Sequence, residues 1–134
     1  MQTAVAQYQK IRTTTSTPGE LLLALYDGLF RFLHGSKHAL EQGNRRDGGR
    51  LASRAHAVVS ELLLALDHDA APELCANLAA LYDFCLDRLT TANLRGDAKS
   101  VDECIRVLTP LREAWKLAVR KAAHEGAAGT GRRA

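Results

Sequence analysis

Two histidines have the spacing most suggestive of chemistry in this sequence. His34 and His38 are four residues apart, so on an α-helix they share one face, and two imidazoles at that spacing can bind a metal ion. A metal site needs further ligands, and no third ligand with matching spacing accompanies this pair. The Glu-x-x-His signature of di-iron bundles is also absent from the sequence. We therefore interpret both histidines as solvated surface residues and expect no metal and no cofactor.

The remaining reactive side chains form no catalytic motif. The three cysteines, Cys75, Cys85 and Cys104, fall on predicted apolar helix faces, which is typical of free buried thiols in a reducing compartment. There is no nucleophile motif and no glycine-rich phosphate loop. There is also no apolar run long enough to cross a bilayer, and no signal peptide is visible. We expect a cytoplasmic protein without enzymatic activity.

Four amphipathic helices must position these residues. The chain has 134 residues, of which 46% are hydrophobic but only 5% aromatic, and the abundance of Ala and Leu favours helix over strand. Apolar residues recur at helical spacing in four stretches that are separated by short polar links. Short links favour antiparallel neighbours, so the sequence predicts an all-α fold, an antiparallel up-down four-helix bundle. The expected helices cover residues 17–42, 50–66, 72–94 and 100–124.

Local signals set the expected helix ends. Thr17, Pro18 and Glu20 form an N-cap with a capping box, and Ser100 with Glu103 predicts a second capping box. Residues 45–49 read as a polar loop, and Pro110 is expected to kink the last helix. The predicted core stripes of the last three helices are Leu51, Ala55, Val58, Val59, Leu62, Leu66; Leu74, Leu78, Leu81, Cys85, Leu89, Ala92; and Val101, Cys104, Ile105, Leu108, Leu111, Trp115, Ala118, Val119.

The bundle domain, residues 17–124, is flanked by two segments of different character. Residues 1–16 read as an extended N-terminal arm, and the Gly- and Ala-rich residues 125–134 as a disordered tail. Tyr8 and Ile11 are apolar residues in the otherwise polar arm. Either the arm is a frayed terminus or these two side chains dock on the domain, and the sequence alone favours the frayed terminus.

The first helix is more apolar than one face of a bundle requires. Ten of the thirteen residues from Leu21 to Leu33 are apolar, and they span an arc of roughly 220°. If Leu22, Leu25, Leu29 and Phe32 face the core, then a second stripe is left over, formed by Leu23, Tyr26 and Phe30. Either this helix is the most enclosed one of the bundle, or the second stripe lines a groove for an amphipathic partner. The pattern leaves both alternatives open.

Four motifs in a compatible order resemble one family. They are Thr17-Pro18-x-Glu20-Leu21 running into Leu25-Tyr26-Asp27-Gly28, Asn77-Leu78-x-x-Leu81-Tyr82-Asp83, Arg88-Leu89-x-x-Ala92-Asn93-Leu94-Arg95-x-Asp97, and Arg112-Glu113-Ala114-Trp115-Lys116. Together they resemble the FliS family, the flagellar secretion chaperone for flagellin, over residues 8 to 120. The resemblance implies a cytoplasmic helical bundle that binds the C-terminal segment of flagellin. It also implies that binding prevents premature polymerisation and presents flagellin to the type III export gate.

The resemblance also indicates where the partner binds. In the family an N-terminal arm with a tyrosine covers part of the groove when flagellin is absent, which favours docking of Tyr8 and Ile11. The grooves are expected between the first, third and fourth helices, with Asn93 as a polar anchor. The predicted partner-binding residues are Tyr8, Ile11, Leu23, Tyr26, Phe30, Leu78, Leu81, Tyr82 and Asn93.

Two alternatives come from other classes of protein. A helical nucleic-acid-binding module would use Arg45, Arg46, Arg50, Arg54 and the Arg132-Arg133 pair, although a net charge of +3 speaks against it. A structural bundle would self-associate through Leu23 or Phe30.

Overall fold

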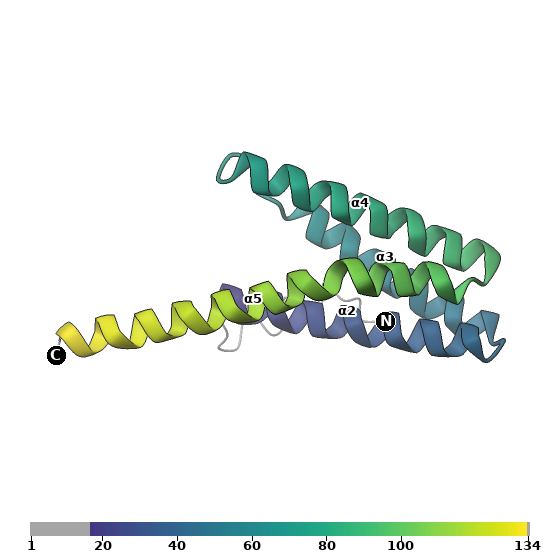
Figure 1. The fold of residues 1–134 in the computed structure, drawn as a ribbon, viewed down its shortest axis with the longest axis horizontal. Helices are drawn as coiled ribbons and strands as arrows, with labels where there is room; N and C mark the ends of the chain where they lie inside the picture. Colours follow the sequence, from purple (N-terminus) through teal and green to yellow (C-terminus); the bar gives the residue numbers. More distant parts are fainter. Residues whose placement is uncertain (1–16, 134) are drawn as a thin grey trace.

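The chain forms four helices joined by short turns. In a computed structural model, which describes residues 17–133 and side chains as far as residue 126, the helices are α2 (Pro18–Glu41), α3 (Arg45–Leu64), α4 (Pro72–Arg95) and α5 (Ala98–Arg133) (Figure 1). No strand occurs among these described residues. The predicted all-α class is therefore confirmed, whereas the predicted arm, with Tyr8 and Ile11, lies outside the described part of the chain.

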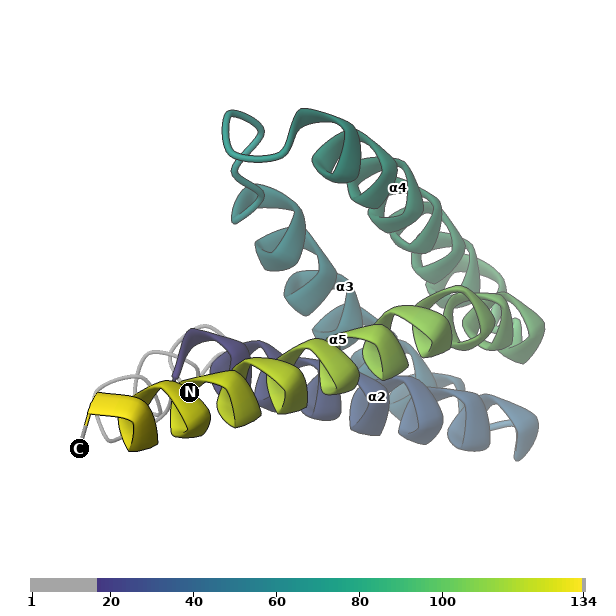
Figure 2. The same ribbon diagram turned by 60° about the vertical axis from the view of Figure 1, so that its left-hand side comes forward.

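Successive helices run antiparallel, as in an up-down bundle. α2 packs against α3 and α5, and α4 packs against the same two helices, so α2 and α4 occupy one diagonal. The α3–α4 hairpin diverges from α2 and α5 toward the tip formed by residues 65–71 (Figure 2). The two turns at the other end, α2–α3 and α4–α5, lie beside each other (Figure 1). The bundle thus has one closed end and one splayed end.

The start of α2 is as predicted. The amide of Glu20 donates to Thr17 Oγ1 at 3.2 Å, and the amide of Thr17 donates to Glu20 Oε2 at 3.3 Å, which completes the capping box. At the other end Gly43 has φ 79°, a left-handed conformation that glycine adopts without a steric penalty. These two local signals fix the limits of α2.

α3 begins five residues earlier than predicted, and the expected loop 45–49 is its first turn. Asn44 caps it, since its Oδ1 accepts from the amide of Asp47 at 3.1 Å. Gly48 and Gly49 are buried there because neighbouring helices approach closely. A Cβ on Gly48 would lie 2.4 Å from Leu40 Cδ2, and one on Gly49 would lie 2.7 Å from Asn93 Oδ1. The glycines that suggested a loop serve helix packing instead.

The limits of α5 also differ from the prediction. Asp97 rather than Ser100 lies at its start, because Asp97 Oδ1 accepts from the amide of Lys99 at 3.0 Å and Oδ2 accepts from Ser100 Oγ at 2.9 Å. The predicted Ser100–Glu103 capping box is therefore wrong, and Ser100 is buried in the first turn. α5 continues through Pro110 to Arg133, in contrast to the disordered tail expected for residues 125–134. Alanine sustains a helix and each glycine costs only about 1 kcal/mol, so this composition does not by itself end one.

The core of α3, α4 and α5 follows most of the predicted stripes, but Leu74 and Ala118 are exposed. The buried core cluster includes Leu29 and Leu33 on α2. The other helices contribute Val58, Val59, Leu62, Leu78, Cys85, Leu89, Ala92, Val101, Cys104 and Leu108. Leu74, predicted as a core residue, is 51% exposed. It lies in the first turn of α4 near the splayed tip, where Cys75 and Leu78 turn toward the bundle in its place.

Candidate partner-binding site

The buried face of α2 is centred differently from the prediction. Tyr26 and Phe30, assigned to the second stripe, are 0% and 5% exposed, whereas Leu22, Leu25 and Phe32 are only partly buried at the edge of the core. The enclosed residues are Tyr26, Leu29, Phe30 and Leu33, which follow the i, i+3, i+4, i+7 pattern. The helical wheel gives the width of an apolar arc, but the flanking α3 and α5 decide which part of the arc is covered.

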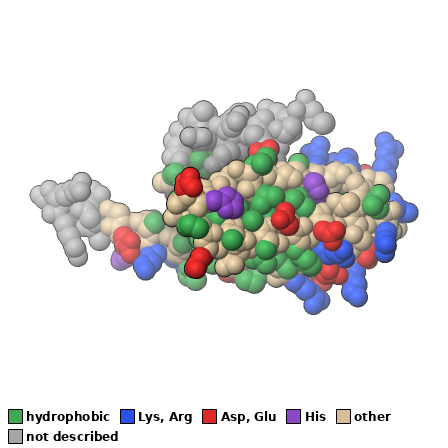
Figure 3. Space-filling view, turned by 90° about the horizontal axis from the view of Figure 1, so that it is seen from above, with side chains coloured by type: hydrophobic (Ala, Val, Ile, Leu, Met, Phe, Trp, Pro, Cys, Tyr) green, Lys and Arg blue, Asp and Glu red, His purple; other side chains and the backbone are tan. Residues whose placement is uncertain are grey.

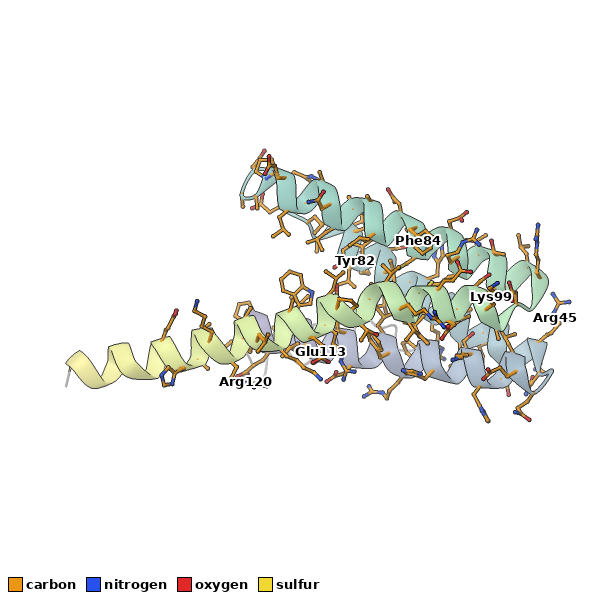
Figure 4. The ribbon with its side chains drawn as sticks, viewed as in Figure 1. Arg45, Tyr82, Phe84, Lys99, Glu113 and Arg120 are labelled. Atoms are coloured by element: carbon orange, nitrogen blue, oxygen red, sulfur yellow. The ribbon has the colours of Figure 1, made fainter. Side chains whose placement is uncertain are left out.

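A tyrosine pair spans the diagonal between α2 and α4. The hydroxyl oxygens of Tyr26 and Tyr82 lie 2.6 Å apart in the buried core, and either can donate. Tyr82 is on the side of α4 that faces α5 (Figure 4). Desolvation raises the pKa of Tyr26, and the hydrogen bond with Tyr82 and the nearby Trp115 indole partly oppose this increase. Desolvation, with the proximity of Tyr26, also raises the pKa of Tyr82, so both phenols stay neutral near pH 7.

An arginine clamp closes the core beside this pair. Arg112 Nη2 on α5 donates to Asp27 Oδ1 on α2, and the guanidinium carbon lies 5.0 Å from the centroid of the Phe30 ring. Arg112 Nε and Trp115 Nε1 are buried and have no hydrogen bond of ordinary geometry within the described residues. The Trp115 ring packs against the core, as its place in the α5 stripe predicted. The clamp links the Tyr-Asp-Gly motif to the Arg-Glu-Ala-Trp motif.

Asn93 lies at a shallow groove between α3 and α4. Its Nδ2 donates to Ser53 Oγ at 3.0 Å, and its side chain is exposed at the rim. The groove has a volume of about 260 Å³, and its walls include His56, Thr90 and Leu94. Asn93 therefore ties two helices together while keeping part of its amide at the surface.

The predicted partner-binding residues do not form one surface. Tyr26, Phe30, Leu78 and Tyr82, which the sequence analysis places on a groove wall, are buried in the core. Leu23 and Leu81 are half-buried, and Asn93 is exposed. The binding role of each stays a prediction, and for the four buried residues a direct contact would require the bundle to open.

The larger apolar groove was missed by sequence reasoning. It has a volume of about 570 Å³ and lies between the start of α2 and the second half of α5. A Cβ on Gly19 would lie 2.8 Å from Val119 Cγ2, so a glycine here lets the two helices approach. The groove is lined by Thr17, Pro18, Gly19, Glu20, Leu22, Trp115, Ala118, Val119, Ala122, Ala123 and Gly126. Its signal in the sequence is the i, i+4 pair of small residues Ala118 and Ala122 behind Trp115.

Exposed apolar side chains supply further contact area. The large ones are Leu64, Leu74, Phe84, Leu94 and Leu117. Seen from the α4 side, hydrophobic side chains are interspersed with acidic ones over much of the visible face (Figure 3). Phe84 on α4 is the one aromatic residue among them.

The described residues offer little for metal chemistry. His34 and His38 are exposed on α2, and no group of three or more His, Cys, Asp or Glu residues is arranged to hold a metal ion within the described part of the chain. None of the helices, over their described residues, is both long and apolar enough to cross a membrane.

Comparison of the sequence with known proteins points to one family. The family described as "Flagellar protein FliS" matches residues 1–122. The Bacillus subtilis protein "Flagellar secretion chaperone FliS" is 33% identical over 120 residues, which are 90% of this chain and 89% of that protein. The protein of the same name from Salmonella typhimurium is 35% identical over 112 residues, 83% of each chain.

A solved structure supports the fold. A protein described as a flagellar chaperone from bacteria superposes with a TM-score of 0.72 at 23% identity, covering 88% of this chain and 96% of its own. The motifs, the four-helix arrangement and these matches agree, and the chain belongs to the FliS family of flagellar secretion chaperones.

Proposed function

We propose that this protein is an export chaperone for flagellin. It binds the disordered C-terminal segment of flagellin in the cytosol, prevents premature polymerisation, and aids delivery to the export gate of the flagellar type III secretion system. It acts by binding and not by catalysis. The proposal is supported by relatives that carry the name flagellar secretion chaperone and match over most of both chains.

The apolar groove between α2 and α5 is the observation that carries this proposal. Leu22, Trp115 and Val119 give it apolar walls, and Ala118 and Ala122 leave room for a second helix to approach. An amphipathic segment can lay its apolar face into a groove of this kind.

The alternative of a self-associating bundle is less favoured. Phe30 is buried, so self-association through Leu23 and Phe30 would lose one of its two contacts.

Several contacts must act together for useful affinity. Each buried Leu or Phe of the client contributes about 1.5–3 kcal/mol, whereas ordering a disordered segment costs about 2–5 kcal/mol or more. One groove that accepts two or three side chains would therefore hold the client only weakly. Leu23, Leu81 and Asn93 remain our candidates for additional contacts, because each is at least partly exposed.

Calorimetric titration of a flagellin C-terminal peptide into the full chain tests the proposal. Ala122→Asp places a charge on the groove wall at an exposed helical position, and we expect the affinity to fall at least about tenfold. Ala57→Asp introduces the same change at an exposed position of α3 outside the groove, and binding should stay within about twofold. No binding to the unmodified chain would rule out this client, and equal loss in both variants would rule out this groove.

A further inference from the structure

The net charge conceals a strong separation of charge along the bundle. Residues 55–87, which form the outer half of α3, the hairpin tip and most of α4, contain six acidic residues and no Lys or Arg. Positive charge gathers instead at the closed end, where the Lys and Arg side chains stand out at one extremity of the molecule (Figure 3). The acidic residues of the hairpin are Glu61, Asp67, Asp69, Glu73, Asp83 and Asp87.

The closed end brings together cations from two turns far apart in the sequence. Arg45 Nη2 donates to the carbonyl of Leu94 at 2.8 Å, and a Cβ on Gly96 would lie 2.6 Å from Arg45 Nε. The α2–α3 turn is therefore held against the α4–α5 turn. Arg45 and Lys99 lie at this same end (Figure 4). We call this surface the basic end; its residues are Arg45, Arg46, Arg50, Arg95 and Lys99.

Two of the three carboxylates near these cations, Asp97 and Asp47, are already engaged, whereas Glu41 at the end of α2 is exposed and offsets one positive charge. Both carboxylate oxygens of Asp97 accept hydrogen bonds at the start of α5. Asp47 Oδ2 accepts from Asn44 Nδ2 at 2.9 Å, and its Oδ1 lies 3.9 Å from Arg50 Nε. In contrast, Arg46, Arg95 and Lys99 are exposed, and their side chains make no ion pair with any described residue. Their charge is available to a partner.

We propose that the basic end docks on an anionic membrane surface. Arg46, Arg95 and Lys99 contact lipid phosphates, and Leu94, which is 75% exposed beside them, enters the headgroup layer. Each Lys or Arg held near an anionic bilayer strengthens binding roughly fivefold, so a few cations give weak, reversible docking. This inference does not rest on the identity of the client.

Two observations favour a membrane over other polyanions. Nucleic-acid sites place a long stripe of cations along a helix or groove, whereas these cations cap one end of a bundle, where Arg45 contacts the backbone of the exposed Leu94. A specific protein interface needs about 800 Å² per partner with a packed apolar centre, and a single leucine does not supply that centre.

The separation of charge also sets the orientation. An anionic surface attracts the basic end and repels the acidic hairpin tip, so the bundle stands on its closed end. The apolar groove begins at the start of α2, about 30 Å from that end along a helix of this length. The groove therefore stays open to a client while the protein is docked.

Vesicle flotation of the full chain tests this inference. We expect binding to vesicles of equimolar phosphatidylglycerol and phosphatidylcholine, a steep loss of binding with added salt, and no binding to phosphatidylcholine alone. Arg46→Glu combined with Arg95→Glu should weaken binding at least about fiftyfold. Arg120→Glu combined with Lys121→Glu makes the same change of charge on the distal part of α5, away from Arg45 (Figure 4), and should stay within about threefold. All four positions are exposed, and circular dichroism checks that the variants fold.

Three outcomes would overturn it. Equal binding to neutral vesicles would show that the charge is irrelevant. Equal loss in both double variants would show an effect of net charge without a defined docking end. Tighter binding to an oligonucleotide or to poly-glutamate than to the anionic vesicles, at the same salt concentration, would assign the basic end to another class of partner.

Discussion

At the scale of single residues, the Tyr26–Tyr82 pair is the feature that most changes the interpretation of the motifs. Both tyrosines belong to segments that resemble the family, and the sequence analysis predicts that both line the partner groove. The structure places them in contact across the core, at 2.6 Å between the hydroxyl oxygens. A buried hydroxyl needs a partner, so each tyrosine makes the other favourable at its position. We infer that these motif residues fix how α2 and α4 face each other.

A mutant cycle on this pair gives the first prediction of stability. Tyr82→Phe leaves the hydroxyl of Tyr26 buried without its partner, and we expect a loss of about 1–3 kcal/mol in the free energy of unfolding. Tyr26→Phe combined with Tyr82→Phe removes both polar groups and should cost less than the sum of the single changes. Urea denaturation measures all three variants. If the loss in the double variant equals the sum of the losses in the two single variants, the hydrogen bond contributes nothing to stability.

The same pair predicts how stability depends on alkaline pH. The folded-state pKa of each tyrosine is raised above its ordinary value of about 10, mainly by desolvation. Above that pH the unfolded chain loses protons that the native state retains, so the free energy of unfolding falls as the pH rises. Combining Tyr26→Phe with Tyr82→Phe should reduce this slope. A hydrogen bond with Cys85, together with burial, raises the pKa of Cys104. The double variant should therefore still lose some free energy of unfolding with rising pH, beginning near pH 9, but with a smaller slope.

Equilibrium denaturation between neutral pH and pH 11 distinguishes these contributions. If the double phenylalanine variant and the unmodified protein show the same slope above pH 10, the tyrosines do not carry the effect.

At the scale of elements, the helices are specified locally but their packing is not. The capping box of Thr17 and Glu20, which the structure confirms, and the left-handed glycines that follow α2 and α4 act within a few residues. The start of α3 shows the opposite case. Gly48 and Gly49 suggest a loop when read alone, and only their contacts with Leu40 and Asn93 explain why glycine occurs inside a helix.

Two glycine substitutions separate local propensity from packing. Gly48→Ala would place a Cβ 2.4 Å from Leu40 Cδ2, and we expect a loss of about 1–3 kcal/mol despite the better helix propensity of alanine. Gly28→Ala is the matched control, because its Cβ would meet only Arg31 Nη2 at 3.7 Å. It should gain about 0.5–1 kcal/mol. Thermal unfolding of both variants tests the pair, and a stabilised Gly48→Ala would contradict the close packing of α3 against α2.

At the scale of the whole molecule, position along the bundle separates the basic end from the other two features. The apolar groove at the start of α2 and the acidic hairpin tip both lie toward the splayed end, and the basic end lies at the opposite extremity. A client in the groove and an anionic surface at the basic end would not compete for the same residues. The overall charge of +3 gives no sign of this arrangement, because opposite charges cancel in the sum.

The number of helices, the antiparallel bundle, most of the core and the family can all be predicted from the sequence alone. These depend on periodicity, on caps and on residue types, which are properties of neighbours in the chain. The sequence predicted the width of the apolar arc of α2 but not its centre, so Tyr26 and Phe30 were assigned to the wrong side.

Four features follow only from the three-dimensional arrangement of the helices: the centre of the buried face of α2, the close approach at Gly48, the groove beside Trp115 and the contact of Arg45 with the α4–α5 turn. Each of these features joins residues from different helices. Which helix lies beside which, and at what distance, is set by the packing of the whole bundle, and no single stretch of sequence carries that information.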